Sequence, residues 1–197
     1  MRDDILRLEE WAAGRGVNII VDESFVDFAD IPEQTLLTQS IIDEHKHLIV
    51  LKSISKSFGV PGLRLGIIAS AASDMIAAMK KDVSIWNINS FAEYYMQIIE
   101  KYKADYEEAM SRFMDVRKRY VDKLAKIPAL RVFPSQANYI MCHLENGMSS
   151  RKLADIMLNK YNILIKDLST KEGLNGGNYI RPVSYTHLRA HETRHDL

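Results

Sequence analysis

A lysine surrounded by hydroxyl groups and glycines is the part of the sequence best suited to chemistry. Lys56 follows an apolar run, with Ser53 and Ser55 before it and Arg64 eight positions after it. A lysine amine can form a Schiff base with an aldehyde when burial or neighbouring cations favour its neutral form. The serine hydroxyls and the arginine guanidinium can hold a phosphate through charge-assisted hydrogen bonds. This segment therefore predicts a site for an anionic cofactor that carries an aldehyde.

Asp22 supplies the complementary acidic group. It ends the apolar run at residues 17–21, and Lys56 comes shortly after the run at residues 48–51. If the two runs are parallel strands, both side chains lie at the sheet edge where ligands of open α/β folds bind. A carboxylate there can keep a ring nitrogen protonated, which makes the ring an electron sink. Taken singly, such an aspartate is most often a cap and such a lysine is solvated, but their order and spacing favour a site.

The elements that must position these residues follow from the hydrophobic periodicity. Apolar runs of strand length lie at residues 17–21, 48–51 and 65–69. Amphipathic spacing predicts helices at residues 5–13 and 74–81, and one or two long helices within 89–127. Apolar strands that alternate with helices predict a parallel sheet with helices on both faces.

The texture of the sequence changes after residue 128. Short strands are predicted at residues 130–133, 137–143, 163–166 and 179–181, with a helix near residues 150–160. We therefore expect part of a large domain at residues 1–88, connecting helices at 89–127 and a small α/β domain at 128–182. The apolar stripe of the connecting helices is expected to pack in a core.

The composition is that of a globular protein, with 47% hydrophobic residues and 26 basic side chains against 26 acidic ones. Zero net charge disfavours a nucleic-acid partner, because such proteins need surplus cations to neutralise phosphates. No apolar run approaches the ~18 residues of a membrane span, and the acidic start is unlike a signal peptide. The single cysteine cannot form an internal disulfide. We expect a cytoplasmic protein without a membrane or nucleic-acid partner.

Four motifs together resemble those of the fold-type I pyridoxal-phosphate enzymes of the aminotransferase class I/II family, in particular its histidinol-phosphate aminotransferase and threonine-phosphate decarboxylase branch. Residues 22–25 are similar to the family's Asp-x-x-Tyr element, and residues 53–66 to its lysine signature. Residues 134–139 are similar to its Pro-Ser-x-Ala-Asn-Phe strand, and residues 178–181 to its C-terminal arginine element. The resemblance implies part of the large PLP-transferase domain, with a mainly parallel sheet, plus a small C-terminal α/β domain.

The resemblance also implies pyridoxal 5′-phosphate as the cofactor. Lys56 would bind the cofactor's aldehyde and later move the proton at the substrate Cα, while Asp22 would hold the pyridinium. The residues that would grip the cofactor phosphate are Ser53, Ser55 and Arg64.

Three further residues bear on the cofactor and the substrate. By the resemblance, Arg181 would bind the substrate α-carboxylate. Phe25 stands where most family members carry a tyrosine, so it would contact the cofactor without that hydroxyl. Lys166 follows a predicted strand, where it would meet either solvent or a phosphate group on the substrate.

The resemblance implies transfer of an amino group between an amino acid and a 2-oxo acid. The amino acid is either unmodified or phosphorylated on its side chain. A decarboxylase of a phosphorylated amino acid is the close alternative, because sequence does not reveal which Cα bond is broken. An inactive fragment and a PLP-binding regulatory domain also stay open. Residues 53–56 fit the Ser-x-x-Lys element of penicillin-recognising enzymes as well, but no Ser-Asp-Asn or Lys-Thr-Gly follows.

Both ends of the chain are atypical. Residues 183–197 carry His187, His191 and His195, whose spacing of four could present a metal site on a helix. This segment has little apolar content and resembles the read-through of a sequencing adapter, so we expect a non-native tail and no metal. The family's Gly-rich turn, stacking aromatic and Asn-Pro-x-x-Gly stretch are not found before Asp22, which predicts a fragment of a homodimeric parent.

Overall fold

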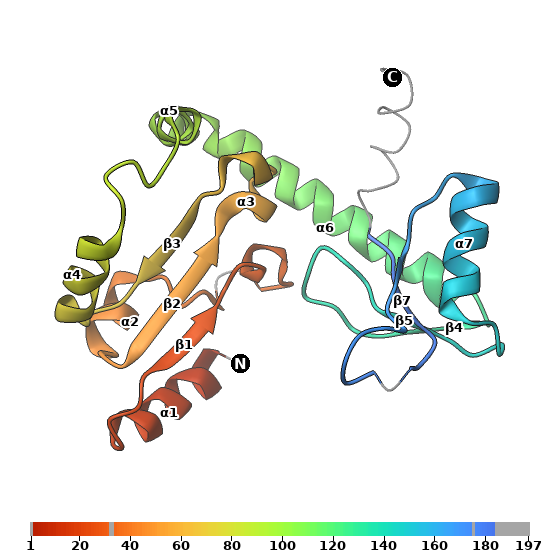
Figure 1. The fold of residues 1–197 in the computed structure, drawn as a ribbon, viewed down its shortest axis with the longest axis horizontal. Coiled ribbons are helices and arrows are strands. Elements are labelled where there is room, and N and C mark those ends of the chain that lie inside the picture. The colour runs from red at the N-terminus through yellow and green to blue at the C-terminus, as the bar shows by residue number, and fades with distance from the viewer. Residues whose placement is uncertain (1, 32–33, 175, 184–197) are drawn as a thin grey trace. The chain divides into compact units, whose positions relative to one another are not determined.

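The structure, a computed structural model, describes residues 2–31, 34–174 and 176–183. The chain forms two compact units, residues 1–110 and 111–197, and their boundary falls within helix α6 (Lys103–Ala125). Each unit combines helices with a β-sheet, which confirms the predicted α/β class (Figure 1).

The sheet of the first unit has its strands in the order β1-β2-β3. β1 (Ile19–Asp22) and β2 (Leu48–Ser53) run parallel, as predicted. β3 (Gly66–Ala69) runs antiparallel to β2, so the prediction of a parallel strand here is wrong. Between them the chain has only α3 (Ile54–Ser57) and the 3₁₀ helix η3 (Pro61–Leu63). At about 1.5 Å rise per residue, so short a helix cannot carry the chain back along β2, as a parallel crossover requires.

The core of the first unit lies on one face of this sheet. The buried side chains of Leu36, Leu48 and Val50 pack with residues of α1 (Arg2–Ala13) and α2 (Gln39–Glu44). These helix residues are Ile5, Leu6, Ile41 and Ile42. On the opposite face the edge-strand residues Ile20 and Ile68 are 63% and 49% exposed. Within the described residues, helices therefore do not cover both faces completely, in contrast to the expectation.

The helical stretch predicted at residues 89–127 is confirmed as α5 (Ser90–Ile98), the 3₁₀ helix η4 (Ile99–Tyr102) and α6. Asn89 caps α5, because its side chain accepts a hydrogen bond from the backbone N–H of Ala92 at 2.9 Å. The expected core stripe is buried only in part, since Tyr102 and Val116 are 52% and 40% exposed. The preceding helix, α4 (Ser73–Asp82), matches its prediction closely.

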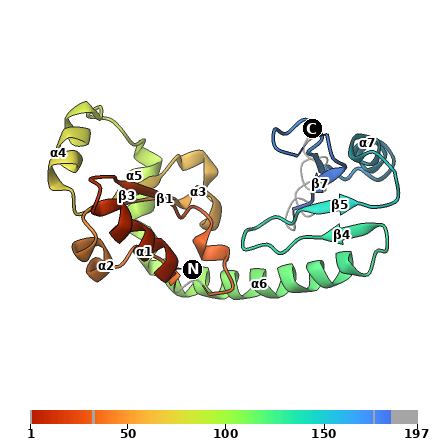
Figure 2. The same cartoon turned by 90° about the horizontal axis from the view of Figure 1, so that it is seen from below.

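The second unit is an antiparallel sheet in the order β4-β5-β7-β6, with α7 (Ser150–Tyr161) beside it (Figure 2). The strands are β4 (Leu130–Val132), β5 (Cys142–Leu144), β6 (Lys166–Asp167) and β7 (Tyr179–Arg181). The core residues Ile140, Cys142, Leu144 and Ile180 pack with Tyr120, Val121 and Leu124 of α6 and with Leu153 of α7.

The strand predicted at residues 137–143 is confirmed only towards its end, because residues 136–138 form a bend, Tyr139 makes an isolated antiparallel bridge to Val183 and β5 begins at Cys142. Ser135 Oγ donates to the carbonyl of Tyr139 at 2.5 Å and accepts from the N–H of Ala137 at 3.1 Å. The serine side chain thus satisfies backbone groups locally, which competes with strand pairing.

No helix among the described residues is long and apolar enough to cross a membrane. In the same part of the chain, no three His, Cys, Asp or Glu side chains are grouped as metal ligands. The predictions for His187, His191 and His195 lie outside the described residues.

Candidate active site

Asp22 and Lys56 lie at the same edge of the first sheet. Asp22 is the last residue of β1, and Lys56 lies in α3, which begins immediately after β2. Because β1 and β2 are parallel, their carboxyl ends meet at one edge, where α/β folds bind ligands. The amine and the carboxylate also interact, since the positive charge of Lys56 is one of the influences that lower the pKa of Asp22.

Ser24 is the main partner of the Asp22 carboxylate. Its hydroxyl and its backbone N–H, 2.9 Å from Oδ1, are the largest influences that lower the pKa of Asp22, and they outweigh the opposing effect of burial. The Ser24 oxygen also accepts a hydrogen bond from the backbone N–H of Ser53 at 3.0 Å. Ser24 therefore joins the ends of β1 and β2 and keeps Asp22 ionised.

The aromatic ring of Phe25 contacts the amine of the candidate lysine. The Lys56 Nζ lies 4.8 Å from the centroid of the Phe25 ring, within the range of a cation–π contact. Phe25 follows Asp22 by three residues. The last residue of β1 thus presents the carboxylate near the amine, and the residues that follow β1 present the ring.

The loop after Lys56 folds back on itself. Ser55 is buried, and its hydroxyl donates to the carbonyl of Leu65 at 3.4 Å. Arg64 is exposed and donates to the carbonyl of Pro61 at 3.2 Å. Its backbone is left-handed, with φ 58°, a conformation that costs a non-glycine residue about 1 kcal/mol or more. Since Ser53 is paired with Gly66 in the sheet, Arg64 stands at the same edge as Lys56.

A second charged pair, which the sequence patterns did not reveal, links β2 to the segment that follows β1. The Nζ of Lys52 lies 2.6 Å from Oδ1 of Asp27, and their side chains are only 13% and 18% exposed. Asp27 belongs to the 3₁₀ helix η1 (Val26–Phe28), shortly after Asp22. Burial, with a smaller contribution from the Asp27 charge, raises the pKa of Tyr106 to about 12. No motif marks such a pair, because its two members are 25 residues apart.

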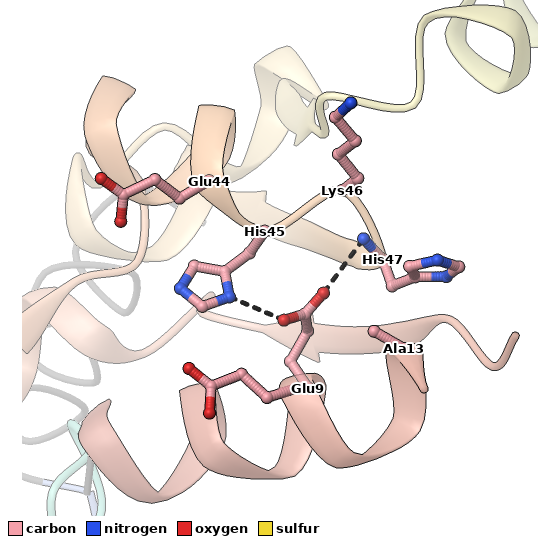
Figure 3. A pocket seen from close by; sticks show the side chains of 7 residues that line it. Glu9, Ala13, Glu44, His45, Lys46 and His47 are labelled. Carbon is pink, nitrogen blue, oxygen red and sulfur yellow. Dashed lines mark hydrogen bonds and ion pairs between the residues drawn. The ribbon is translucent and has the colours of Figure 1, made fainter. Parts of the chain in front are cut away.

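A cavity of about 470 Å³ lies at the other end of β2, next to the buried carboxylate of Glu9 (Figure 3). Glu9 Oε2 lies 2.6 Å from Nδ1 of His45, and Oε1 accepts the backbone N–H of His47 at 3.1 Å. Glu9 thereby fastens α1 to the segment that enters β2. This cavity is remote from the Asp22–Lys56 edge, because β2 separates His47 from α3.

Arg181 belongs to the second unit. It is exposed at the end of β7, with its guanidinium 4.9 Å from the centroid of the Tyr139 ring. Lys166 of β6 is its direct partner in the antiparallel register, so both side chains project from the same face of that sheet. The other face carries Ile180, which is part of the core.

The family model described as Aminotransferase class I and II matches residues 1–173. The chain belongs to this family. Pyridoxal 5′-phosphate is the cofactor of the aminotransferase class I and II family, so this membership confirms the predicted cofactor. One edge of the first sheet carries groups whose chemistry fits this cofactor: an amine, a carboxylate, an aromatic ring and an arginine.

The names of curated relatives refer to both phosphonate and phosphate compounds. The chain is 32% identical to a CMP-5′-(3-aminopropyl)phosphonate synthase of Streptomyces rubellomurinus, covering 90% of this chain and 28% of the relative. It is also 32% identical to the L-serine phosphate decarboxylase Cj1436c of Campylobacter jejuni, covering 86% of this chain and 44% of the relative. The chain therefore spans less than half the length of these relatives.

Among solved structures, the histidinol-phosphate aminotransferase from Clostridium acetobutylicum superposes with a TM-score of 0.83 at 28% identity. The match covers 100% of this chain and 60% of that structure. Decarboxylases and aminotransferases thus both occur among the similar proteins. The chain itself belongs to a family of PLP-dependent enzymes.

Proposed function

We propose that this chain supplies the lysine-bearing half of a PLP-dependent enzyme that acts on a phosphorylated amino acid. The observation that carries the proposal is the Asp22–Lys56 pair at the carboxyl ends of two parallel strands. When bound, the cofactor supplies an electron sink for a carbanion at the substrate Cα.

The residues of the first unit divide the work at this edge. The amine of Lys56 holds the cofactor and then takes or returns the proton at Cα, as a general base and acid. Asp22 stays ionised, because Ser24 lowers its pKa, and can therefore keep a ring nitrogen protonated. Arg64 has an exposed guanidinium that suits a phosphate. Ser53 and Ser55 complete the proposed phosphate grip, in which the Ser55 hydroxyl turns from the Leu65 carbonyl to the phosphate.

The second unit supplies the groups that bind substrate. Arg181 binds the α-carboxylate in this proposal, and Lys166 adds a second cation beside it. Directly opposite residues in an antiparallel pair have Cβ atoms about 5 Å apart. Two cations so close together suit a substrate with two anionic groups. The names of the similar proteins, which include L-serine phosphate decarboxylase and histidinol-phosphate aminotransferase, support a phosphorylated substrate.

Transamination is the reaction proposed first, with a 2-oxo acid as the second substrate. Decarboxylation is the second candidate, and the 32% identity to an L-serine phosphate decarboxylase favours it specifically. The homodimer and the cytoplasmic location stay predictions from the sequence.

The test uses the complete protein that contains this chain, loaded with cofactor and given L-serine phosphate with and without 2-oxoglutarate. A transaminase releases an oxo acid and needs the 2-oxo acid for repeated turnover, whereas a decarboxylase releases carbon dioxide without it. Turnover of L-serine and L-threonine phosphates no faster than that of their unphosphorylated forms would contradict the proposed substrate class.

A further inference from the structure

The carboxylate of Asp167, the residue next to Lys166 in β6, accepts three hydrogen bonds. Its Oδ1 accepts the hydroxyl of Ser150 at 2.7 Å and the backbone N–H of Ser169 at 3.0 Å. Its Oδ2 accepts the hydroxyl of Ser169 at 2.8 Å. Burial opposes ionisation, but these hydrogen bonds together lower the pKa of Asp167. Asp167 is therefore an ionised anchor with fixed geometry.

The partner Ser150 is itself immobilised. It is the first residue of α7 and has 0% exposure. The neighbouring Ser149 has a different task, since its hydroxyl caps α7 by accepting the N–H of Lys152 at 3.2 Å. The two adjacent serines thus have different roles. Ser149 caps the helix, and Ser150 joins the helix to Asp167.

The hydrogen bonds of Asp167 act on a short strand at the edge of the sheet. β6 consists of Lys166 and Asp167 and, among the described strands, pairs with β7. On either side of β6, Ile165 packs against the core and the backbone N–H of Leu168 donates to the carbonyl of Tyr179 at 3.0 Å, and the Ser150–Asp167 contact adds a side-chain link to α7. Asp167 is opposite Ile180 on the core face, and Lys166 is opposite Arg181 on the other face. Because side chains alternate along a strand, a slip of one residue would turn Lys166 towards the core and away from Arg181.

We propose that the Ser150–Asp167 contact is a positioning device that fixes the register of β6, so that Lys166 stands beside Arg181 and meets the second anionic group of the substrate. This inference rests on the proposed function, which assigns Lys166 and Arg181 to the substrate. Ser150 and Asp167 do not touch the substrate in this arrangement, and they act through Lys166.

The complete, cofactor-loaded protein tests the inference by comparing two adjacent serine variants. Ser150→Ala removes the hydrogen bond that ties Asp167 to α7, whereas Ser149→Ala removes the cap of the same helix and leaves that hydrogen bond in place. We expect Ser150→Ala to raise KM for L-serine phosphate about tenfold, the factor that corresponds to one hydrogen bond with a charged group, and to change kcat less than twofold. Inorganic phosphate should lose potency as an inhibitor by a similar factor. Ser149→Ala should lower the melting temperature but leave KM unchanged.

A further pair of variants separates the possible failures. Lys166→Ala should raise KM at least as much as Ser150→Ala does. If Lys166→Ala has no effect on KM, the proposed substrate role of Lys166 fails. If Lys166→Ala raises KM but Ser150→Ala and Ser149→Ala behave alike, only the positioning role is overturned. Ser169→Ala loosens the same carboxylate without altering α7, so it gives the same test if Ser150→Ala does not fold.

Discussion

The partly buried pair of Asp27 and Lys52 joins the two segments that carry the candidate catalytic groups. Asp27 follows Asp22 by five residues, and Lys52 precedes Lys56 by four. The Asp27 Oδ1–Lys52 Nζ distance is 2.6 Å, and both side chains are less than one fifth exposed. Removing one partner leaves the other charge without compensation in a partly dry environment, so stability and site geometry should suffer together.

The magnitude follows from this burial. Replacing Asp27 with Ala should lower the free energy of unfolding by about 3 kcal/mol, the lower end of the range for breaking a buried ion pair, because some solvent still reaches the group. The double variant Asp27→Leu, Lys52→Met removes both charges and should cost less than about 1 kcal/mol, since apolar side chains of similar size can replace such a pair.

Urea denaturation of the wild type, Asp27→Leu, Lys52→Met and the double variant measures the coupling as a double-mutant cycle, and Asp27→Ala is measured beside it. The exposed pair of Arg131 and Glu145, 3.4 Å apart, is the control, because its loss should cost well under about 1 kcal/mol. A cost for Asp27→Ala as small as that of the exposed pair would refute the conclusion that burial makes the contact important. So would a double variant that is less stable than either single variant.

Three further predictions concern the carboxylates. Replacing Ser24 with Ala should raise the pKa of Asp22, because the serine hydroxyl is the largest influence that lowers it; carbon-detected NMR titration measures the change, and an unchanged pKa would contradict the assignment. Asp167 has a lowered pKa, so its contribution to stability is present above the ordinary value of 3.8 and is lost as pH falls through the lower value of the folded state. Acid unfolding of an Asp167→Asn variant should therefore show a smaller loss of stability between pH 5 and 2, and equal losses would argue against it. Replacing Glu9 with Ala removes the hydrogen-bond partner of the His45 ring and of the partly buried His47 N–H. Thermal denaturation should show a free energy of unfolding lower by roughly 2–4 kcal/mol, against little change for the neighbouring Glu10→Ala.

The sequence was sufficient for much of the fold because the positions of its strands follow from local patterns. The apolar run before Asp22 and the run before Lys56 are each of strand length and each end at polar residues. Both form strands of the parallel pair. The direction of β3 could not be read in this way, since it depends on how far the residues between β2 and β3 can travel. The strand predicted at residues 137–143 is shorter than expected for a related reason, because the Ser135 side chain holds a bend at residues 136–138 that periodicity does not record.

The candidate site shows the same division between local and distant information. Asp22 and Lys56 could be matched from their motifs, and the structure brings them to one edge. Asp27 and Lys52 are 25 positions apart, and Ser150 and Asp167 are 17 positions apart. Local spacing in the sequence therefore does not predict either contact. Such supporting contacts depend on the assembled sheet and become visible only with coordinates.

The most direct test of the central claim is to find the residue that bonds the cofactor. The complete protein is loaded with pyridoxal 5′-phosphate, reduced with borohydride and digested, and mass spectrometry locates the added phosphopyridoxyl group. We expect the label on Lys56 alone, its loss in a Lys56→Ala variant, and its retention in the matched exposed-lysine variant Lys80→Ala. A label on another lysine such as Lys52, or a Lys56→Ala protein that is labelled as fully as the wild type, would contradict the assignment of this site.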